Sequence, residues 1–166
     1  MNAYRMVITG EELLRRYSNG QRNLKGVNIN STYFSRVNLS GINLTDVDLS
    51  NITFEEVDLG ESSLNGSSLI ECYFWKTNLS GASLINADLR QASFIQSNLN
   101  ETNLSGVQWL EAEFVDSSLI EARGVVSSSG LFKNTTMPDG QIMNSSGQPI
   151  GNWARTQQLS LSLFRG

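Results

Sequence analysis

Residues 77–101 read TNLSG ASLIN ADLRQ ASFIQ SNLNE when they are written in blocks of five, and the third residue of every block is large and apolar. The same spacing runs without a gap from Leu24 to Leu119, over twenty positions that are all Leu, Ile, Phe or Trp. A period of five fits neither an α-helix, which repeats every ~3.6 residues, nor an ordinary strand, which alternates every ~2 residues. The chain is therefore predicted to be an array of short structural repeats.

Each block of five also predicts a turn. The residue two places before the apolar centre is mostly small or β-branched, as at Val47 and Ala87, so both positions are expected to point inward. The residue just before the centre is mostly Asn, Asp, Ser or Thr, whose side chains bond to nearby backbone. Glycine often follows two places after the centre, as at Gly66 and Gly81, which is consistent with a tight corner.

A second period of twenty residues lies on top of the first. Phenylalanine occupies the centre at Phe34, Phe54, Phe74, Phe94 and Phe114, and at no other centre of the series. Four blocks per circuit would stack these five rings in one column, which we predict to be the structural core. The fold class is then all-β, a four-sided solenoid of about five coils and, at the spacing of paired backbones, about 24 Å long.

The two ends of the chain differ from the repeats and are predicted to cap them. We expect a single domain, 1–166, with the solenoid at 22–123. Within the N-terminal cap, 1–21, the capping-box spacing at Thr9 predicts a short helix over 10–19. The pattern fails after Glu121, so 124–166 is predicted to be a mostly irregular C-terminal cap. Its last part, 159–164, alternates like a half-buried strand.

The repeats resemble those of the pentapeptide-repeat proteins. The family pattern of a small residue, Asn or Asp, Leu, Ser or Thr and a variable residue is visible in Ala87-Asp88-Leu89-Arg90-Gln91 and Val47-Asp48-Leu49-Ser50-Asn51. The resemblance covers about 22–123 and implies a right-handed quadrilateral β-helix. The segment 12–20 looks like the helical opening of cyanobacterial members, including one that promotes heterocyst differentiation, and 134–140 looks like a tail common among them. This similarity suggests a cyanobacterial source and a regulatory role.

The composition argues against an enzyme. The sequence contains no histidine, the commonest general base and metal ligand, and its one cysteine, Cys72, stands at an inward position. The family resemblance carries over no catalytic residues either. We therefore assign no catalytic, metal-binding or cofactor-binding residue and expect no cofactor. No signal peptide or membrane span is visible, so the cytoplasm is the expected compartment.

The repeats are acidic, and this charge suggests one possible function. Residues 22–121 contain thirteen acidic and five basic side chains, a net charge of −8. Family members that confer quinolone resistance mimic duplex DNA and bind DNA gyrase, so the resemblance makes such mimicry the alternative function. Its candidate surface is the acidic column of Glu61, Glu101 and Glu121, which Gly81 interrupts. Because these carboxylates are widely spaced, a solvated face is the simpler interpretation.

The apolar surface suggests a different function. The positions just after each centre face outward, and on the phenylalanine side Trp75, Ile95 and Val115 follow one another on successive coils. Exposed apolar patches of this kind usually mark an interface. The candidate partner-binding residues on the phenylalanine side are Tyr33, Tyr73, Trp75, Ile95 and Val115, and an adjacent side adds Ile70 and Leu110.

The function expected from this surface is a non-enzymatic protein–protein interaction module, of regulatory role, that binds a protein partner of unknown identity through one solenoid face. No direct nucleic-acid or membrane binding is expected, and the chain is expected to be a monomer or a weak homodimer. Its own C-terminal segment, which contains Trp153, is the other candidate to cover the apolar residues.

Overall fold

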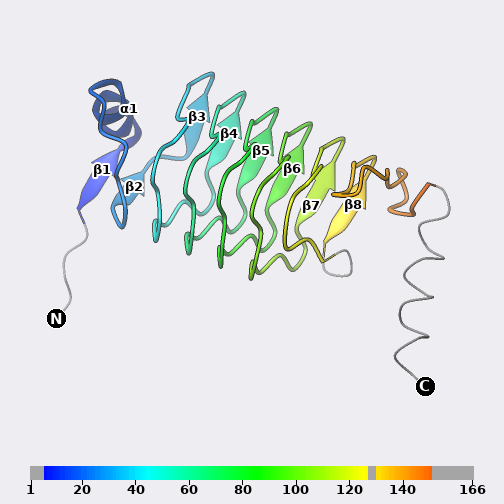
Figure 1. The fold of residues 1–166 in the computed structure, drawn as a ribbon. Helices are drawn as coiled ribbons and strands as arrows, with labels where there is room; N and C mark the ends of the chain where they lie inside the picture. Colours follow the sequence, from blue (N-terminus) through cyan, green and yellow to red (C-terminus); the bar gives the residue numbers. More distant parts are fainter. Residues whose placement is uncertain (1–5, 127–129, 151–166) are drawn as a thin grey trace.

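The chain winds into a parallel β-solenoid of about six turns (Figure 1). The computed structural model describes residues 6–126 and 130–150. One side of the solenoid is a six-stranded parallel sheet, whose strands follow in chain order: β3 (Tyr33–Ser35), β4 (Thr53–Glu55), β5 (Tyr73–Trp75), β6 (Ser93–Ile95), β7 (Glu113–Val115) and β8 (Leu131–Lys133).

The twenty-residue register makes the solenoid four-sided, as the sequence predicts. On the sheet side, Phe34 pairs with Phe54 and Phe54 with Phe74. The other three sides are held by single parallel bridges with the same offset, such as Asn43 to Ser63 and Asp58 to Asn78. Each interior coil therefore hydrogen-bonds to the coils on both sides of it, and no coil depends on its own contacts alone.

The phenylalanine column is the centre of the core. The rings of Phe54, Phe74, Phe94 and Phe114 are buried, and successive centroids lie 4.6–4.9 Å apart with interplanar angles of 2–6°. Phe34 stacks on Phe54 less closely, at 5.7 Å. Because each ring contacts the identical ring of the next coil, the column fixes the register between coils. The predicted core residues are confirmed.

The corners lie two residues after each apolar centre, where the sequence often has glycine. Fifteen non-glycine residues of the described chain also have a left-handed backbone there, with Glu61 at φ 56° and Lys76 at φ 51° as examples. This conformation costs roughly 1–2 kcal/mol at a non-glycine residue. Coil-to-coil hydrogen bonds, such as Glu61 N–H to the carbonyl of Ser80, offset that cost.

The N-terminal cap is a short strand followed by a helix. Strand β1 (Val7–Thr9) pairs in parallel with β2 (Asn28–Asn30), and helix α1 (Gly10–Ser18) follows directly. The side chain of Thr9 caps the helix by accepting a hydrogen bond from the N–H of Glu12. Ile8 and Leu13 are buried in the main core. The cap therefore covers the first coil with apolar side chains, as predicted.

The C-terminal end adds a sixth coil to the five that the repeats predict. Gly124 stands where the next apolar centre would come, and a Cβ there would lie 2.6 Å from the backbone nitrogen of Ser105. The chain passes too close to the preceding coil for a side chain. It then resumes the column with Phe132, opposite Phe114 at an offset of eighteen residues. The five-residue spacing, continued past Leu119, does not reach Phe132, because the last circuit is two residues shorter than the others.

An irregular segment with buried methionines follows the sixth coil. Residues 136 and 142 form one antiparallel bridge and residues 143 and 149 another, while Met137 and Met143 are buried. This segment fits the expected C-terminal cap. Trp153 and the alternating segment 159–164 lie outside the described residues.

A column of buried hydroxyl groups runs beside the phenylalanine rings. Ser97 Oγ donates to the carbonyl of Phe74 at 3.2 Å and accepts from the N–H of Thr77 at 3.1 Å. Ser117 makes the same two kinds of bond one coil further on. These hydroxyls satisfy backbone groups at a corner of the core, where an unpaired group would be costly. In contrast, the buried hydroxyl of Ser62 has no hydrogen-bond partner among the described residues.

Two serine-to-alanine substitutions should therefore differ in their effect on stability. Ser97→Ala leaves the Thr77 N–H without its partner, and we expect the free energy of unfolding to fall by about 1–3 kcal/mol. Ser62→Ala removes a hydroxyl that makes no bond, so we expect little change or a small gain. Denaturant unfolding followed by circular dichroism measures both; equal losses would contradict the assignment.

Cys72 should be unreactive in the folded chain. Its thiol is buried and donates to the carbonyl of Leu49 at 3.0 Å, and burial raises the pKa of the thiol to about 12. We expect Ellman's reagent to leave the native protein unlabelled at pH 8 and to label one thiol per chain after unfolding. Because the folded pKa is raised, the thiol also contributes stability below the unfolded pKa, and this contribution is lost as the pH rises through about 12. Rapid labelling of Cys72 in the native protein would contradict this prediction, because the thiol would then be accessible without unfolding.

Candidate functional site

The strands β3–β8 present a continuous row of outward side chains on each side of the phenylalanine column. We call this outer surface the sheet face. The row before the column consists of Tyr33, Thr53, Tyr73, Ser93, Glu113 and Leu131. The row after the column consists of Ser35, Glu55, Trp75, Ile95, Val115 and Lys133. Alternation along each three-residue strand puts one Phe inside and two side chains outside.

The middle of the sheet face is an apolar patch formed by Tyr73, Trp75, Ile95 and Val115. Trp75, Ile95 and Val115 occupy equivalent positions on β5, β6 and β7, so each is in register with the next. These three side chains are half-buried, whereas Tyr73 is 43% exposed. The amine of Lys76 lies 4.5 Å from the centre of the Trp75 ring, a cation–π contact at the edge of the patch. The structure brings four of the predicted partner-binding residues together here.

Tyr33 is not part of this patch. It lies two strands from Tyr73 in the same row, with Thr53 between them. Its hydroxyl donates a hydrogen bond to the carboxylate of Glu55 on the next strand. Tyr33 is half exposed and bounds the N-terminal end of the sheet face rather than extending the apolar centre.

Ile70 and Leu110 lie on a different side of the solenoid, in the row that follows the centres Leu69, Leu89 and Trp109. Arg90 separates them, and together with Gln91 and Glu111 the three line a hollow of about 260 Å³. Two nitrogens of the Arg90 guanidinium bind the carboxylate of Asp88 at 2.7–2.8 Å, and this pairing lowers the pKa of Asp88. A charged pair therefore interrupts the apolar character of this side.

The acidic column is sparse. Glu61, Glu101 and Glu121 are exposed at equivalent corners, and Gly81 occupies the corner between the first two. Because Gly81 has no side chain, the carboxylate of Glu61 lies over it, where a Cβ would collide with the Glu61 oxygen. In the neighbouring row, the carboxylate of Asp58 accepts a hydrogen bond from the amide of Asn78 at 2.8 Å. Acidic groups here are isolated rather than continuous.

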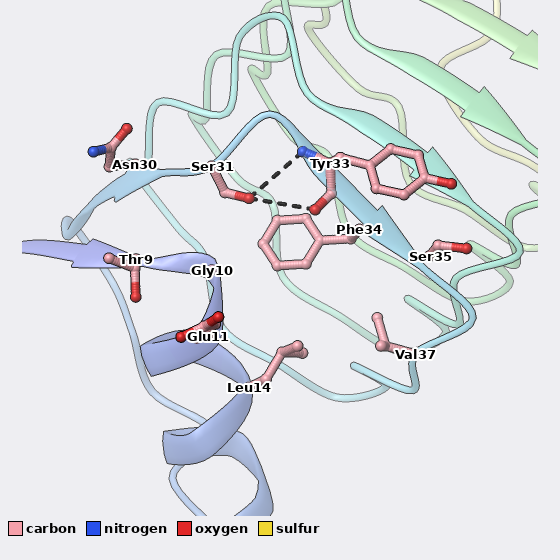
Figure 2. A pocket seen from close by; sticks show the side chains of 10 residues that line it. All are labelled: Thr9, Gly10, Glu11, Leu14, Asn30, Ser31, Tyr33, Phe34, Ser35 and Val37. Atoms are coloured by element: carbon pink, nitrogen blue, oxygen red, sulfur yellow. Dashed lines mark hydrogen bonds between the residues drawn. The ribbon is translucent and has the colours of Figure 1, made fainter.

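A hollow lies at the seam between the N-terminal cap and the first coil (Figure 2). It has a volume of about 480 Å³, and the ring of Phe34 projects toward it while Leu14 of α1 lies opposite. Ser31 bonds only to the backbone of Tyr33, at 3.3–3.5 Å. No cluster of titratable groups converges there among the residues drawn, so the hollow is a packing seam that the sequence pattern does not reveal.

The described part of the chain offers no site for a metal ion. No three Cys, Asp or Glu side chains in 6–126 and 130–150 lie close enough together to bind one. Within these ranges, no helix is long and apolar enough to span a membrane.

The sequence analysis does not identify the charged residues that surround the apolar patch on the sheet face. Lys133 and Glu113 join the two rows because β8 pairs with β7 and β7 with β6. Lys76 and Asp116 stand at the corners next to the row that contains Trp75 and Val115. The signal for Lys76, Glu113 and Asp116 was their place in the five-residue blocks. Lys133 has no such signal in the sequence, because the last circuit is shorter by two residues and Lys133 falls outside the five-residue spacing.

Two of the solved structures that resemble this chain, HetL and Rfr23, are described as pentapeptide repeat proteins. Rfr23, from the cyanobacterium Cyanothece, is 22% identical with a TM-score of 0.52, and the match covers 78% of this chain and 96% of that one. HetL, involved in heterocyst differentiation regulation in the cyanobacterium Nostoc, is 18% identical with a TM-score of 0.46, covering 81% and 99%. QnrB1, a plasmid-mediated fluoroquinolone resistance protein, is 15% identical with a TM-score of 0.39, covering 96% and 97%. At these identities the likeness concerns the fold alone.

The family models match the repeats directly. The model described as a pentapeptide repeat region matches residues 47–123, and the model of eight pentapeptide repeat copies matches residues 23–60. No curated protein matches the sequence. Together the two family models span 23–123, the same stretch that forms the regular coils of the solenoid, and the chain belongs to the pentapeptide-repeat family.

Proposed function

We propose that this chain is a non-enzymatic interaction module, acting in the cytoplasm, that regulates a protein partner by binding it through the sheet face. The observation that carries the proposal is the apolar patch of Tyr73, Trp75, Ile95 and Val115, which lies on the outer surface of a regular sheet. Apolar and aromatic side chains gathered at the centre of a surface, with charged residues around them, are typical of protein interfaces.

The core beneath the patch supports this role because it is rigid. Each outward residue of the patch is a chain neighbour of a stacked phenylalanine, and adjacent rings lie 4.6–4.9 Å apart. Side chains at Trp75 and Ile95 are therefore held one strand apart before any partner arrives. Such preorganisation reduces the entropy lost on binding.

The chemistry available in the described residues also favours binding over catalysis. The sequence has no histidine, and the thiol of Cys72 is buried with its pKa raised to about 12. The carboxylate of Asp88 is held as an ion pair by Arg90. A nucleophile needs a base beside it or a lowered pKa, and neither condition is met at Cys72.

DNA mimicry is less well supported by the geometry of the acidic residues. Duplex DNA carries one negative charge per ~1.7 Å of its axis. The exposed corner column instead supplies Glu61, Glu101 and Glu121 over four coils, with Gly81 in the gap. At about 4.8 Å per coil, Glu61 and Glu101 are about 10 Å apart along the axis.

Partner capture should depend on the apolar patch. A tagged wild-type chain and a Trp75→Glu/Ile95→Glu variant are each incubated with a lysate of the source organism. We expect a protein to be retained by the wild type and lost with the double variant, because two carboxylates would be desolvated in the interface.

Ile85→Glu is the matched control, since Ile85 is also half-buried and follows an apolar centre, but on another side of the solenoid. It should retain the partner. Circular dichroism and melting temperatures establish that all three chains are folded. Equal retention by the wild type and by the double variant would refute the sheet face as the binding site.

DNA gyrase should not be inhibited. In a supercoiling assay with a large molar excess of this protein over gyrase, we expect the yield of supercoiled DNA to be unchanged, because the carboxylates are too widely spaced to replace phosphates. Inhibition that disappears in a Glu61→Gln/Glu101→Gln/Glu121→Gln variant would instead support the acidic column as a DNA-like surface.

A further inference from the structure

Charged side chains frame the apolar patch on the sheet face. The row after the phenylalanine column runs Glu55, Trp75, Ile95, Val115 and Lys133 on the successive strands β4 to β8. Neither Glu55 nor Lys133 forms an ion pair with another described residue. The row therefore consists of one negative charge, three apolar side chains and one positive charge, in that order.

We propose that the sheet face binds a second copy of this chain, with the two solenoids antiparallel. The twofold axis lies in the interface, parallel to strand β6 and over Ile95. This inference rests on the proposed function, since it names the partner of the same face. A twofold interface brings the same surface of both copies together. An axis along the strands keeps each row opposite itself and reverses the order of the strands.

The row after the phenylalanine column is complementary to its own reverse. Glu55 of each copy faces Lys133 of the other, so two ion pairs form at the two ends. Between them, Trp75 faces Val115 of the second copy, and Ile95 faces its equivalent on the axis. Packed sheets lie about 10 Å apart, a distance that these side chains can fill from both sides.

The same rotation also pairs the remaining charges of the face. In the row before the column, Tyr73 comes opposite Glu113, whose carboxylate can accept a hydrogen bond from the phenol. At the corners, Lys76 comes opposite Asp116. None of the three charged residues forms an ion pair within the described part of its own chain. Charge complementarity in two rows, together with a hydrogen bond in the third, favours this register.

Other registers do not give this pairing. If the axis moves to the gap between β5 and β6, Glu55 faces Val115 and Glu56 faces Asp116, which is repulsive. If it moves to the gap between β6 and β7, Glu55 has no strand opposite it. A parallel arrangement, with the axis along the solenoid, would place Glu113 against Val115. Each of these alternatives leaves a carboxylate without a cation opposite it, or against an apolar or acidic side chain.

The size of the face predicts weak association. Six strands at about 4.8 Å and three residues at about 3.3 Å give a flat surface of about 24 by 10 Å. That is well below the ~800 Å² that each partner buries in an interface of standard size. We therefore expect a dissociation constant larger than those of standard-size interfaces, so that the dimer forms only at high local concentration.

A charge swap tests the pairing. Dimerisation of the full chain is measured by sedimentation velocity over a concentration range that brackets this dissociation constant. Glu55→Lys alone sets Lys against Lys133, and Lys133→Glu alone sets Glu against Glu55, so we expect each variant to dimerise at least about tenfold more weakly than the wild type. An equimolar mixture of the two variants restores both ion pairs and should form a mixed dimer of near wild-type affinity.

The double variant Glu55→Lys/Lys133→Glu should also recover wild-type affinity. Both positions lie outside the core, and circular dichroism verifies that every variant is folded. The proposal is overturned if the wild type stays monomeric, if the single variants dimerise as well as the wild type, or if mixing them gives no gain.

Cross-linking tests the position of the axis. Ile95→Cys places one thiol opposite its own copy, so mild oxidation should produce a disulfide-linked dimer. The matched variant Ile85→Cys lies on another side and should stay monomeric. Cys72 is buried and common to both. Equal cross-linking of the two variants would contradict the register.

The two proposals fail in different ways. A monomeric wild type that still captures a different protein through Trp75 and Ile95 overturns the second copy as occupant and leaves the interaction module standing. In the other case, the dimer passes the charge-swap test, and the Trp75→Glu/Ile95→Glu variant captures the same lysate proteins as the wild type. This result identifies the second copy as the occupant of the face.

Discussion

Register between coils is the constraint on which this molecule depends. A twenty-residue circuit returns each residue type to its own position one coil later, so that Phe stacks on Phe at 4.6–5.0 Å along most of the column. A slip of even one residue would bring an outward-facing side chain into the core in place of each ring. Both the parallel hydrogen bonds and the stacked side chains therefore enforce the same alignment, and neither would be stable without the other.

The same constraint creates the candidate interface. Because the core fixes every centre, the residues on each side of it form straight rows on the surface, and neighbours in a row are twenty residues apart in the sequence. Trp75, Ile95 and Val115 become adjacent only for this reason. Function in such a scaffold is expected from faces rather than from pockets, and a face can be changed one residue at a time without disturbing the core.

The sequence predicts most of this architecture, since the period of twenty is visible in the phenylalanines and the helical cap is visible in the capping residue Thr9. It misses the sixth coil, because the period shortens to eighteen residues before Phe132. It places Ile70 and Leu110 on an adjacent side of the solenoid, but it does not reveal the Arg90–Asp88 ion pair between them. Periodicity assigns a residue to a row, but the charges and hydrogen bonds that separate the rows depend on side-chain geometry.

The central claim is that the sheet face binds a second copy of this chain. Methyl NMR spectra recorded as the protein concentration rises test this claim most directly. The account predicts that the chemical shifts of the Ile95 and Val115 methyl groups move with concentration, while those of Ile85 and Ile120, on other sides of the solenoid, stay fixed. Shifts at Ile85 or Ile120 with none at Ile95 and Val115 would place the binding surface elsewhere and contradict the account.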